Sequence, residues 1–317
     1  VRKVGRSGSQ KTCLEHVPEL PFDGKRIRHR ARVKKAGCSP SNRIGLEGFF
    51  IPGPTFGTPV ERYYATEKVY GTIMTTQTGK LYGIGVGPGD PELIPLKAVR
   101  ILGEVDVVFA ASSSKNTYSL AVDIAGRHIP RNTPIIKLPF PMTKDKGETE
   151  AAWRENARTI ISRVAAGERA AFITLGDPMT YSTYGYVLRH LRIGWPHLAV
   201  TTIPGITAYQ AAAAATNQSL VEGEEALLIL SGVNGGERFQ ALSQKPDNVV
   251  FMKAYRNVDG ICRALEEVDR LDTSVAVANC SRKDETIYRD LKTLREQRPN
   301  YWTLIISRPK RHASTEG

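Results

Sequence analysis

The sequence predicts an α/β protein made of two α/β domains, with a parallel sheet in the N-terminal domain and a mixed sheet in the C-terminal one. From Leu81 onward, short apolar runs alternate with helical patterns, which is typical of parallel strands joined by crossover helices. Near the end of the chain three apolar runs follow each other without room for helices between them. This favours an antiparallel edge in the second sheet. The length of 317 residues suffices for two ordinary domains.

Five apolar runs predict the strands of the first sheet. They occupy residues 81–86, 105–111, 135–140, 170–175 and 198–203. Segments 94–102 and 153–164, which lie between these runs, repeat apolar residues at the spacing of one helix face. We therefore expect helical crossovers at these two places.

The second sheet is predicted after Pro204-Gly205, where we place the boundary between the domains. The expected order is helix 206–215, strand 226–230, a helix near 238–242, strand 249–252, helix 258–268, and strands 275–278, 286–291 and 302–307. These assignments predict an N-terminal domain over 78–204, a C-terminal domain over 205–310 and a tail over 311–317.

Residues 1–73 differ from the rest of the chain. They contain 14 Lys and Arg against 6 Asp and Glu, so they carry +8 of the formal net charge of +12. They show no sustained periodicity, and proline and glycine interrupt their apolar stretch. Such a segment has little apolar surface to offset its ordering entropy. We favour a disordered or non-native leader, because Met74 stands just before the first strand; a basic arm for RNA or anionic lipid is the alternative.

The overall composition excludes several classes of protein. Hydrophobic residues make up 41% and charged residues 24% of the chain, and no apolar run is long enough for a membrane helix. The four cysteines show no C-x-x-C spacing, and the histidines show no metal-ligand spacing. A disulfide framework and a metal site are therefore not expected. A reducing cytoplasm is the natural location.

The loop after the first strand is rich in glycine and ends in Gly89-Asp90-Pro91. Its glycine spacing does not fit the dinucleotide fingerprint, and the chain has no P-loop motif. Asp90 suits a helix N-cap and Pro91 the first helical position. The loop is thus either a simple strand-to-helix turn or a place where a ligand approaches the backbone closely.

Three further loops carry the same kind of signal. Gly176-Asp177-Pro178 follows the fourth strand, Pro204-Gly205 precedes an alanine-rich helix, and Met252-Lys253 ends a strand of the second domain. Loops at the carboxyl ends of parallel strands line the ligand crevice of open α/β sheets. Helix capping by Asp177 and core packing by Met252 are the structural alternatives.

The order of these loops resembles the tetrapyrrole (corrin/porphyrin) methyltransferase family, from Lys80 to about Lys310. Within the family, the run from Gly176 to Tyr184 looks most like the C(20)-methyltransferases of precorrin-2 or cobalt-factor II in cobalamin synthesis. Pro95 departs from the pattern, because threonine is common at this position. The segment 1–73 has no counterpart in the family.

The resemblance implies a homodimer that binds S-adenosyl-L-methionine in a cleft between its two domains and methylates a tetrapyrrole, with or without cobalt. The implied cofactor contacts are Pro88, Gly176, Asp177, Thr180, Thr207, Ala208, Met252 and Cys280, or Asn279 in place of Cys280. Ser182, Arg282 and Lys283 are the expected substrate residues, because the substrate carries many carboxylates.

Asp90 and Tyr181 are the candidate bases for the proton that leaves the meso carbon. The alternatives within the family are another corrin position, uroporphyrinogen III or ribosomal RNA. A nucleic-acid-binding protein is disfavoured because the body is nearly charge-balanced, so neither a nucleic-acid nor a membrane partner is expected. A tetrapyrrole carrier without catalytic activity would not need the cofactor residues.

Overall fold

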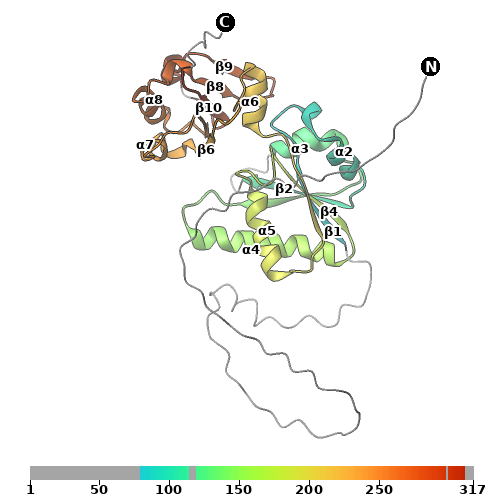
Figure 1. Ribbon diagram of the computed structural model, residues 1–317. Helices are drawn as coiled ribbons and strands as arrows, with labels where there is room; N and C mark the ends of the chain where they lie inside the picture. Colours follow the sequence, from blue (N-terminus) through green and yellow to red (C-terminus); the bar gives the residue numbers. More distant parts are fainter. Residues whose placement is uncertain (1–78, 114–118, 298, 311–317) are drawn as a thin grey trace, which may run out of the picture. The chain divides into compact units, whose positions relative to one another are not determined.

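The structure, a computed structural model, describes residues 79–113, 119–297 and 299–310 (Figure 1). The leader 1–73 and the tail 311–317 lie outside these residues, and the predictions about them stay predictions. Within the described part of the chain, no helix combines the length and the hydropathy needed to cross a membrane.

The first sheet is parallel throughout, as the alternation of strands and helical patterns predicts. Its strands stand in the order β3-β2-β4-β1-β5. They are β1 (Lys80–Gly85), β2 (Val107–Ser113), β3 (Ile135–Phe140), β4 (Arg169–Thr174) and β5 (Val200–Ile203). Because β1 pairs with both β4 and β5, the loops that follow these three strands emerge at one edge of the sheet.

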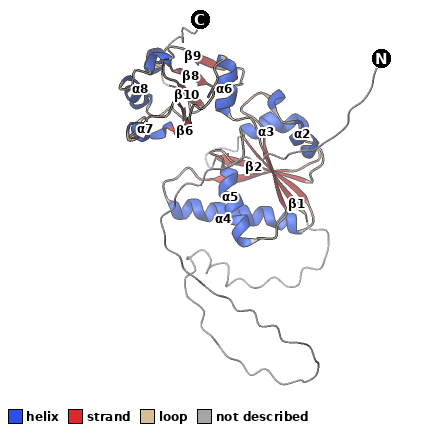
Figure 2. Ribbon diagram, viewed as in Figure 1, coloured by secondary structure: helices blue, strands red, loops and turns tan. Residues whose placement is uncertain are grey.

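Helices cover both faces of this sheet, as Figure 2 shows. They are α2 (Leu96–Leu102), α3 (Leu120–Ala125), α4 (Lys146–Ala165) and α5 (Thr183–Gly194). Alternate residues of β2 point to opposite faces: Val108 packs in the cluster with α2 and α3, whereas Phe109 packs in the cluster with α4 and α5. The sequence patterns predicted α2 and α4 but did not assign α3 or α5.

The second sheet is mixed, as predicted, with the order β6-β7-β10-β8-β9. Its strands are β6 (Leu227–Ser231), β7 (Asn248–Met252), β8 (Val275–Ala278), β9 (Thr286–Tyr288) and β10 (Thr303–Ser307). Only β6 and β7 pair in parallel; β10 is antiparallel to both β7 and β8, and β8 to β9. The antiparallel part therefore extends beyond a single edge strand.

Four helices flank the second sheet. They are α6 (Ala208–Thr216), α7 (Glu237–Gln240), α8 (Val258–Glu266) and α9 (Leu291–Glu296). α6 packs against one face through three consecutive buried alanines, while Phe239 of α7 and the apolar sides of α8 and α9 cover the other.

The expectation that no helix separates the last three strands is wrong. β9 ends at Tyr288, and α9 begins at Leu291. Asp290 caps this helix, because its carboxylate accepts a hydrogen bond of 2.8 Å from the backbone N–H of Lys292. Leu291 and Leu294, at helical spacing, are both buried in the core. The last strand of the first sheet ends at Ile203, and the first strand of the second sheet begins at Leu227. The domain boundary at Pro204-Gly205 stays a prediction.

Candidate functional site

A cavity of about 600 Å³ opens where the loops after the strands meet. All described residues belong to one unit of tertiary contacts, and the cavity wall draws on both sheets. Its volume is within the range of roughly 300–1,000 Å³ typical of small-molecule sites. Eleven predicted site residues line it: Pro88, Gly176, Asp177, Thr180, Tyr181, Ser182, Thr207, Ala208, Met252, Cys280 and Arg282.

Three glycines bring the loops after β1, β4 and β5 into direct backbone contact. A Cβ added at Gly205 would lie 2.2 Å from the carbonyl oxygen of Gly176, and one added at Gly85 would lie 2.5 Å from the same oxygen. Gly87 and Gly176 also exchange backbone hydrogen bonds of 3.3 and 2.7 Å. The close approach leaves no room for a side chain at Gly85 or Gly205, and Gly176 has a φ of +67° that favours glycine. These glycines therefore allow the loops to meet at this edge of the cavity.

Asp177 links two of these loops through its carboxylate. Oδ1 accepts hydrogen bonds from the Met179 N–H at 2.8 Å and from the Thr180 hydroxyl at 3.3 Å. Oδ2 accepts one from the Gly205 N–H at 3.1 Å, across 28 residues of sequence. Capping of its own turn therefore explains two of these three hydrogen bonds, and the third fixes the loop that precedes α6.

The N-terminus of α6 is fixed by a reciprocal pair of hydrogen bonds. The Thr207 hydroxyl accepts from the Gln210 N–H at 3.3 Å, and Gln210 Oε1 accepts from the Thr207 N–H at 3.0 Å. Ala208, the first residue of the helix, leaves this part of the cavity wall without a large side chain. The small residues of this segment thus serve both helix packing and the shape of the cavity.

Met252 and Cys280 give the wall of the second sheet an apolar character. Met252 packs at the margin of the core cluster beneath α6, and Cys280 is buried within it. Burial raises the pKa of the Cys280 thiol to about 12. The thiol is therefore neutral near pH 7 and acts as an apolar wall group rather than as a nucleophile.

Tyr181 and Ser182 line the cavity at the start of α5. Tyr181 has a positive φ of 50° and is 49% exposed. Its hydroxyl donates a 3.3 Å hydrogen bond to the Ile229 carbonyl of β6. The Ser182 hydroxyl accepts from the Tyr184 N–H at 3.1 Å and lies 2.8 Å from the Thr174 hydroxyl, so it caps α5 while it faces the cavity.

Two predicted residues do not line the cavity. Asp90 caps the 3₁₀ turn Pro91–Leu93, since its Oδ1 accepts a 2.8 Å hydrogen bond from the Glu92 N–H. Asp90 is not among the residues that line the cavity, and its role as a base stays a prediction. Lys283 is exposed outside the cavity, and the solvated-loop interpretation describes it better than a substrate contact does.

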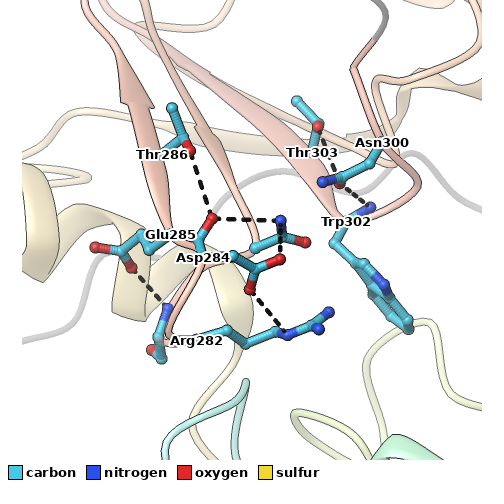
Figure 3. Close-up of polar contacts among 9 residues, drawn as sticks. Arg282, Asp284, Glu285, Thr286, Asn300, Trp302 and Thr303 are labelled. Atoms are coloured by element: carbon cyan, nitrogen blue, oxygen red, sulfur yellow. Dashed lines mark hydrogen bonds and ion pairs between the residues drawn. The ribbon is translucent and has the colours of Figure 1, made fainter.

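Arg282 reaches the cavity from the loop after β8. Its Nε lies 3.5 Å from Asp284 Oδ1, as Figure 3 shows. The same carboxylate accepts a 2.8 Å hydrogen bond from the side-chain amide of Asn279, which also lines the cavity. A Cβ at Gly89 would lie 2.6 Å from Arg282 Cγ, so the loop after β1 packs closely on this side chain.

Sequence reasoning missed much of the second-sheet wall. Lys253, Tyr301 and Trp302 all line the cavity. The sequence pattern placed Trp302 at the start of a strand, gave Tyr301 no assignment, and marked Lys253 only as part of the Met252-Lys253 motif. Two adjacent aromatic residues after Pro299-Asn300 were the available signal. Trp302, labelled in Figure 3, lies in the turn just before β10 and is 38% exposed.

The charged side chains of the described cavity wall are Asp177, Lys253 and Arg282. With two cations and one anion, the described wall carries a formal charge of +1. No group of three or more His, Cys, Asp or Glu suited to a metal ion occurs among the described residues. The arrangement therefore suits an anionic organic ligand with an apolar body.

Comparison with known proteins identifies the family. The model of the Tetrapyrrole (Corrin/Porphyrin) Methylases matches residues 80–295. The cobalt-precorrin-2 C(20)-methyltransferase of Salmonella typhimurium is 33% identical over 229 residues, which cover 72% of this chain and 95% of that protein. The precorrin-2 C(20)-methyltransferase of a Sinorhizobium species is 30% identical over 239 residues, covering 72% and 94%.

A solved structure shares the fold. The uroporphyrin-III C-methyltransferase of Thermus thermophilus, solved with S-adenosylhomocysteine, has a TM-score of 0.52 at 21% identity; the match covers 72% of this chain and 97% of that one. The family match covers the first sheet, the second sheet except β10, and the loops of the cavity up to Arg282. The chain therefore belongs to the tetrapyrrole (corrin/porphyrin) methylase family of methyltransferases.

Proposed function

We propose that the chain transfers a methyl group from S-adenosyl-L-methionine to the C(20) meso carbon of precorrin-2 or cobalt-factor II in cobalamin biosynthesis. The observation that carries the proposal is the match to two C(20)-methyltransferases over 95% and 94% of their lengths. One of these relatives is named for cobalt-precorrin-2 and the other for precorrin-2. Both substrates are therefore included in the experiment.

The cavity fits the cofactor in size and chemistry. Ala208, Met252 and the neutral thiol of Cys280 form an apolar wall, which suits the flat adenine ring. Thr180 and Thr207 place hydroxyl groups on the opposite loops, where polar atoms of a ribose or an amino acid need partners. When bound, S-adenosylmethionine supplies an electrophilic methyl group on a positively charged sulfur.

The chain contributes mainly by orienting the two ligands and excluding water. The close backbone contacts of Gly85, Gly176 and Gly205 and the hydrogen bond from Gly205 to Asp177 hold three loops in a fixed arrangement, so that two ligands can be oriented for in-line transfer. Orientation alone can lower a barrier by several kcal/mol. Of the two candidate bases for the proton of the meso carbon, Tyr181 is the one that lines the cavity. Its Oη donates to the Ile229 carbonyl and keeps lone pairs that can accept a hydrogen bond from a water molecule. Such a water would take up the proton of the meso carbon and release it to solvent.

The homodimer implied by the resemblance and the cytoplasmic location inferred from the cysteine content are part of the same proposal. So is the division into domains at Pro204-Gly205. Light scattering of the purified chain measures the oligomeric state directly, and a monomer at micromolar concentration would contradict that part.

Incubation with S-adenosylmethionine and precorrin-2, with and without inserted cobalt, tests the function. Mass spectrometry should show one added methyl group, and NMR should place it at C(20). A methyl group at another corrin position, or transfer only to uroporphyrinogen III or ribosomal RNA, would refute the assignment.

Calorimetry tests the cofactor site separately. S-adenosylhomocysteine should bind at micromolar strength or better and raise the melting temperature by mass action. A folded chain that does not bind it would show that the cavity is not the cofactor site.

A further inference from the structure

We propose that Lys253 is a substrate-binding residue, whose ammonium group binds a carboxylate of the tetrapyrrole at the second-sheet wall of the cavity. The inference rests on the proposed function and specifies which cation of the cavity contacts the substrate. It also assigns a role to a residue that the sequence motifs left without one.

The backbone of Lys253 is held in an unfavourable conformation. Its φ is +58°, in the left-handed region that lysine rarely adopts because its Cβ then crowds the following carbonyl oxygen. The strain persists because both neighbours are fixed. Met252 pairs with Ser231 in the sheet, and the N–H of the fully buried Ala254 donates a 2.9 Å hydrogen bond to the Thr303 carbonyl.

Two of the other five described non-glycine residues with positive φ also line the cavity. They are Tyr181 and Asn279, with φ of 50° and 52°. Non-glycine residues in this region cluster at ligand sites, where the surrounding structure imposes the geometry. The conformation of Lys253 therefore points to a constraint on where its side chain is directed.

The side chain of Lys253 is available to an anion. Its Nζ lies 5.9 Å from the ring centroid of Tyr301, a cation–π distance that keeps the amine beside the aromatic wall. Among the described residues it has no carboxylate partner. Arg282, the other cation of the wall, is already paired with Asp284 at 3.5 Å. Lys253 is thus the less neutralised of the two cations.

The aromatic residues beside Lys253 suit the rest of such a ligand. Tyr301 and Trp302 pack edge to face, with ring centroids 4.8 Å apart, and both line the cavity. Trp302 leaves part of its ring accessible. A flat macrocycle with carboxylate side chains offers an apolar face to the rings and an anion to the ammonium group. This combination fits the polycarboxylate tetrapyrrole that the proposed function requires.

The test compares three full-length variants with the wild-type chain. Lys253→Met removes the charge, Lys253→Arg keeps it, and Lys283→Met is the matched control, since Lys283 is exposed and outside the cavity. We expect Lys253→Met to raise the KM for the tetrapyrrole about tenfold or more, as loss of a charged hydrogen bond does. The affinity for S-adenosylhomocysteine and the melting temperature should be unchanged. Lys253→Arg should restore much of the KM, and Lys283→Met should have little effect.

Other outcomes would overturn the inference. Equal KM values for Lys253→Met and wild type would exclude the contact. An equal rise in KM for Lys253→Met and Lys283→Met would indicate a long-range effect of the net charge and no specific contact. A fall in the melting temperature of Lys253→Met, together with weaker S-adenosylhomocysteine binding, would indicate a structural role.

A binding assay keeps this inference separate from the proposed function. Quenching of tryptophan fluorescence by uroporphyrin III, a polycarboxylate porphyrin, measures binding without turnover. Wild type that binds it and Lys253→Met that binds about tenfold more weakly would support the contact even if C(20) methylation failed. Equal binding by the two chains would overturn the inference even if methylation succeeded.

Discussion

The replacement Asp177→Asn tests whether the bridge between the β4 loop and the α6 loop shapes the cavity. Asn has the same shape as Asp, but its amide nitrogen cannot accept a hydrogen bond. If the amide oxygen keeps the bond from the Met179 N–H, the amide nitrogen faces the Gly205 N–H, and two donors oppose each other. The opposite orientation loses the Met179 bond instead. One acceptor is lost in either case.

The expected loss of stability follows from these bonds. A hydrogen bond to a charged group contributes about 1.5–3 kcal/mol, and we take about 2 kcal/mol for this half-buried carboxylate. In folded bodies of roughly 150–250 residues, each kcal/mol lowers the melting temperature by about 2–4 °C, so we expect a fall of about 4–8 °C. Because Gly176 and Thr207 lie on the two untethered loops, the affinity for S-adenosylhomocysteine should also fall, by up to about tenfold.

Calorimetry of unfolding and of ligand binding measures both quantities. Asp145→Asn is the matched control: Asp145 caps α4 through the Gly147 and Glu148 N–H groups, and asparagine is an equally good cap. A melting temperature within about 1 °C of wild type in Asp177→Asn would refute the bridge argument. A lower melting temperature with unchanged ligand affinity would show that the bridge supports the fold and not the cavity.

Three further predictions concern a side chain, the pH dependence and the leader. Tyr181→Phe should lower turnover more than cofactor affinity; unchanged turnover removes Tyr181 from the site. Burial raises the pKa of Cys262 to about 11 and of Cys280 to about 12, so both thiols favour the folded state while protonated. Their contribution is complete below about pH 8.5 and is lost as the pH rises. Above that pH, urea unfolding should show the free energy of unfolding falling by up to about 1.4 kcal/mol per pH unit for each thiol. The fall should be less steep in Cys262→Ala, which has one thiol fewer. A free energy of unfolding that stays constant up to about pH 10 would contradict this prediction. A chain that begins at Met74 should bind S-adenosylhomocysteine and methylate as the full chain does, and RNA binding with a steep salt dependence in the full chain alone would support a basic arm instead.

The local pattern of the sequence predicted the class of fold and the loops of the site. Strand and helix periodicity depends on neighbouring residues, so the parallel sheet and most of the second sheet could be predicted. The short helix α9 escaped prediction because its core contacts are Leu291 and Leu294 alone, in a segment that follows an apolar strand. The glycine motifs marked the loops because tight turns restrict the residue types that can occupy them.

The tertiary structure decided which member of each similar pair faces the cavity. Asp90 and Asp177 occupy equivalent Gly-Asp-Pro turns, yet only Asp177 also accepts a hydrogen bond from the neighbouring loop. Lys253 and Lys283 are both lysines after a strand, but only Lys253 lines the cavity. These differences depend on the sheet order, which places β5 beside β1 and β10 between β7 and β8. Contacts between residues distant in sequence set that order, and no local pattern records them.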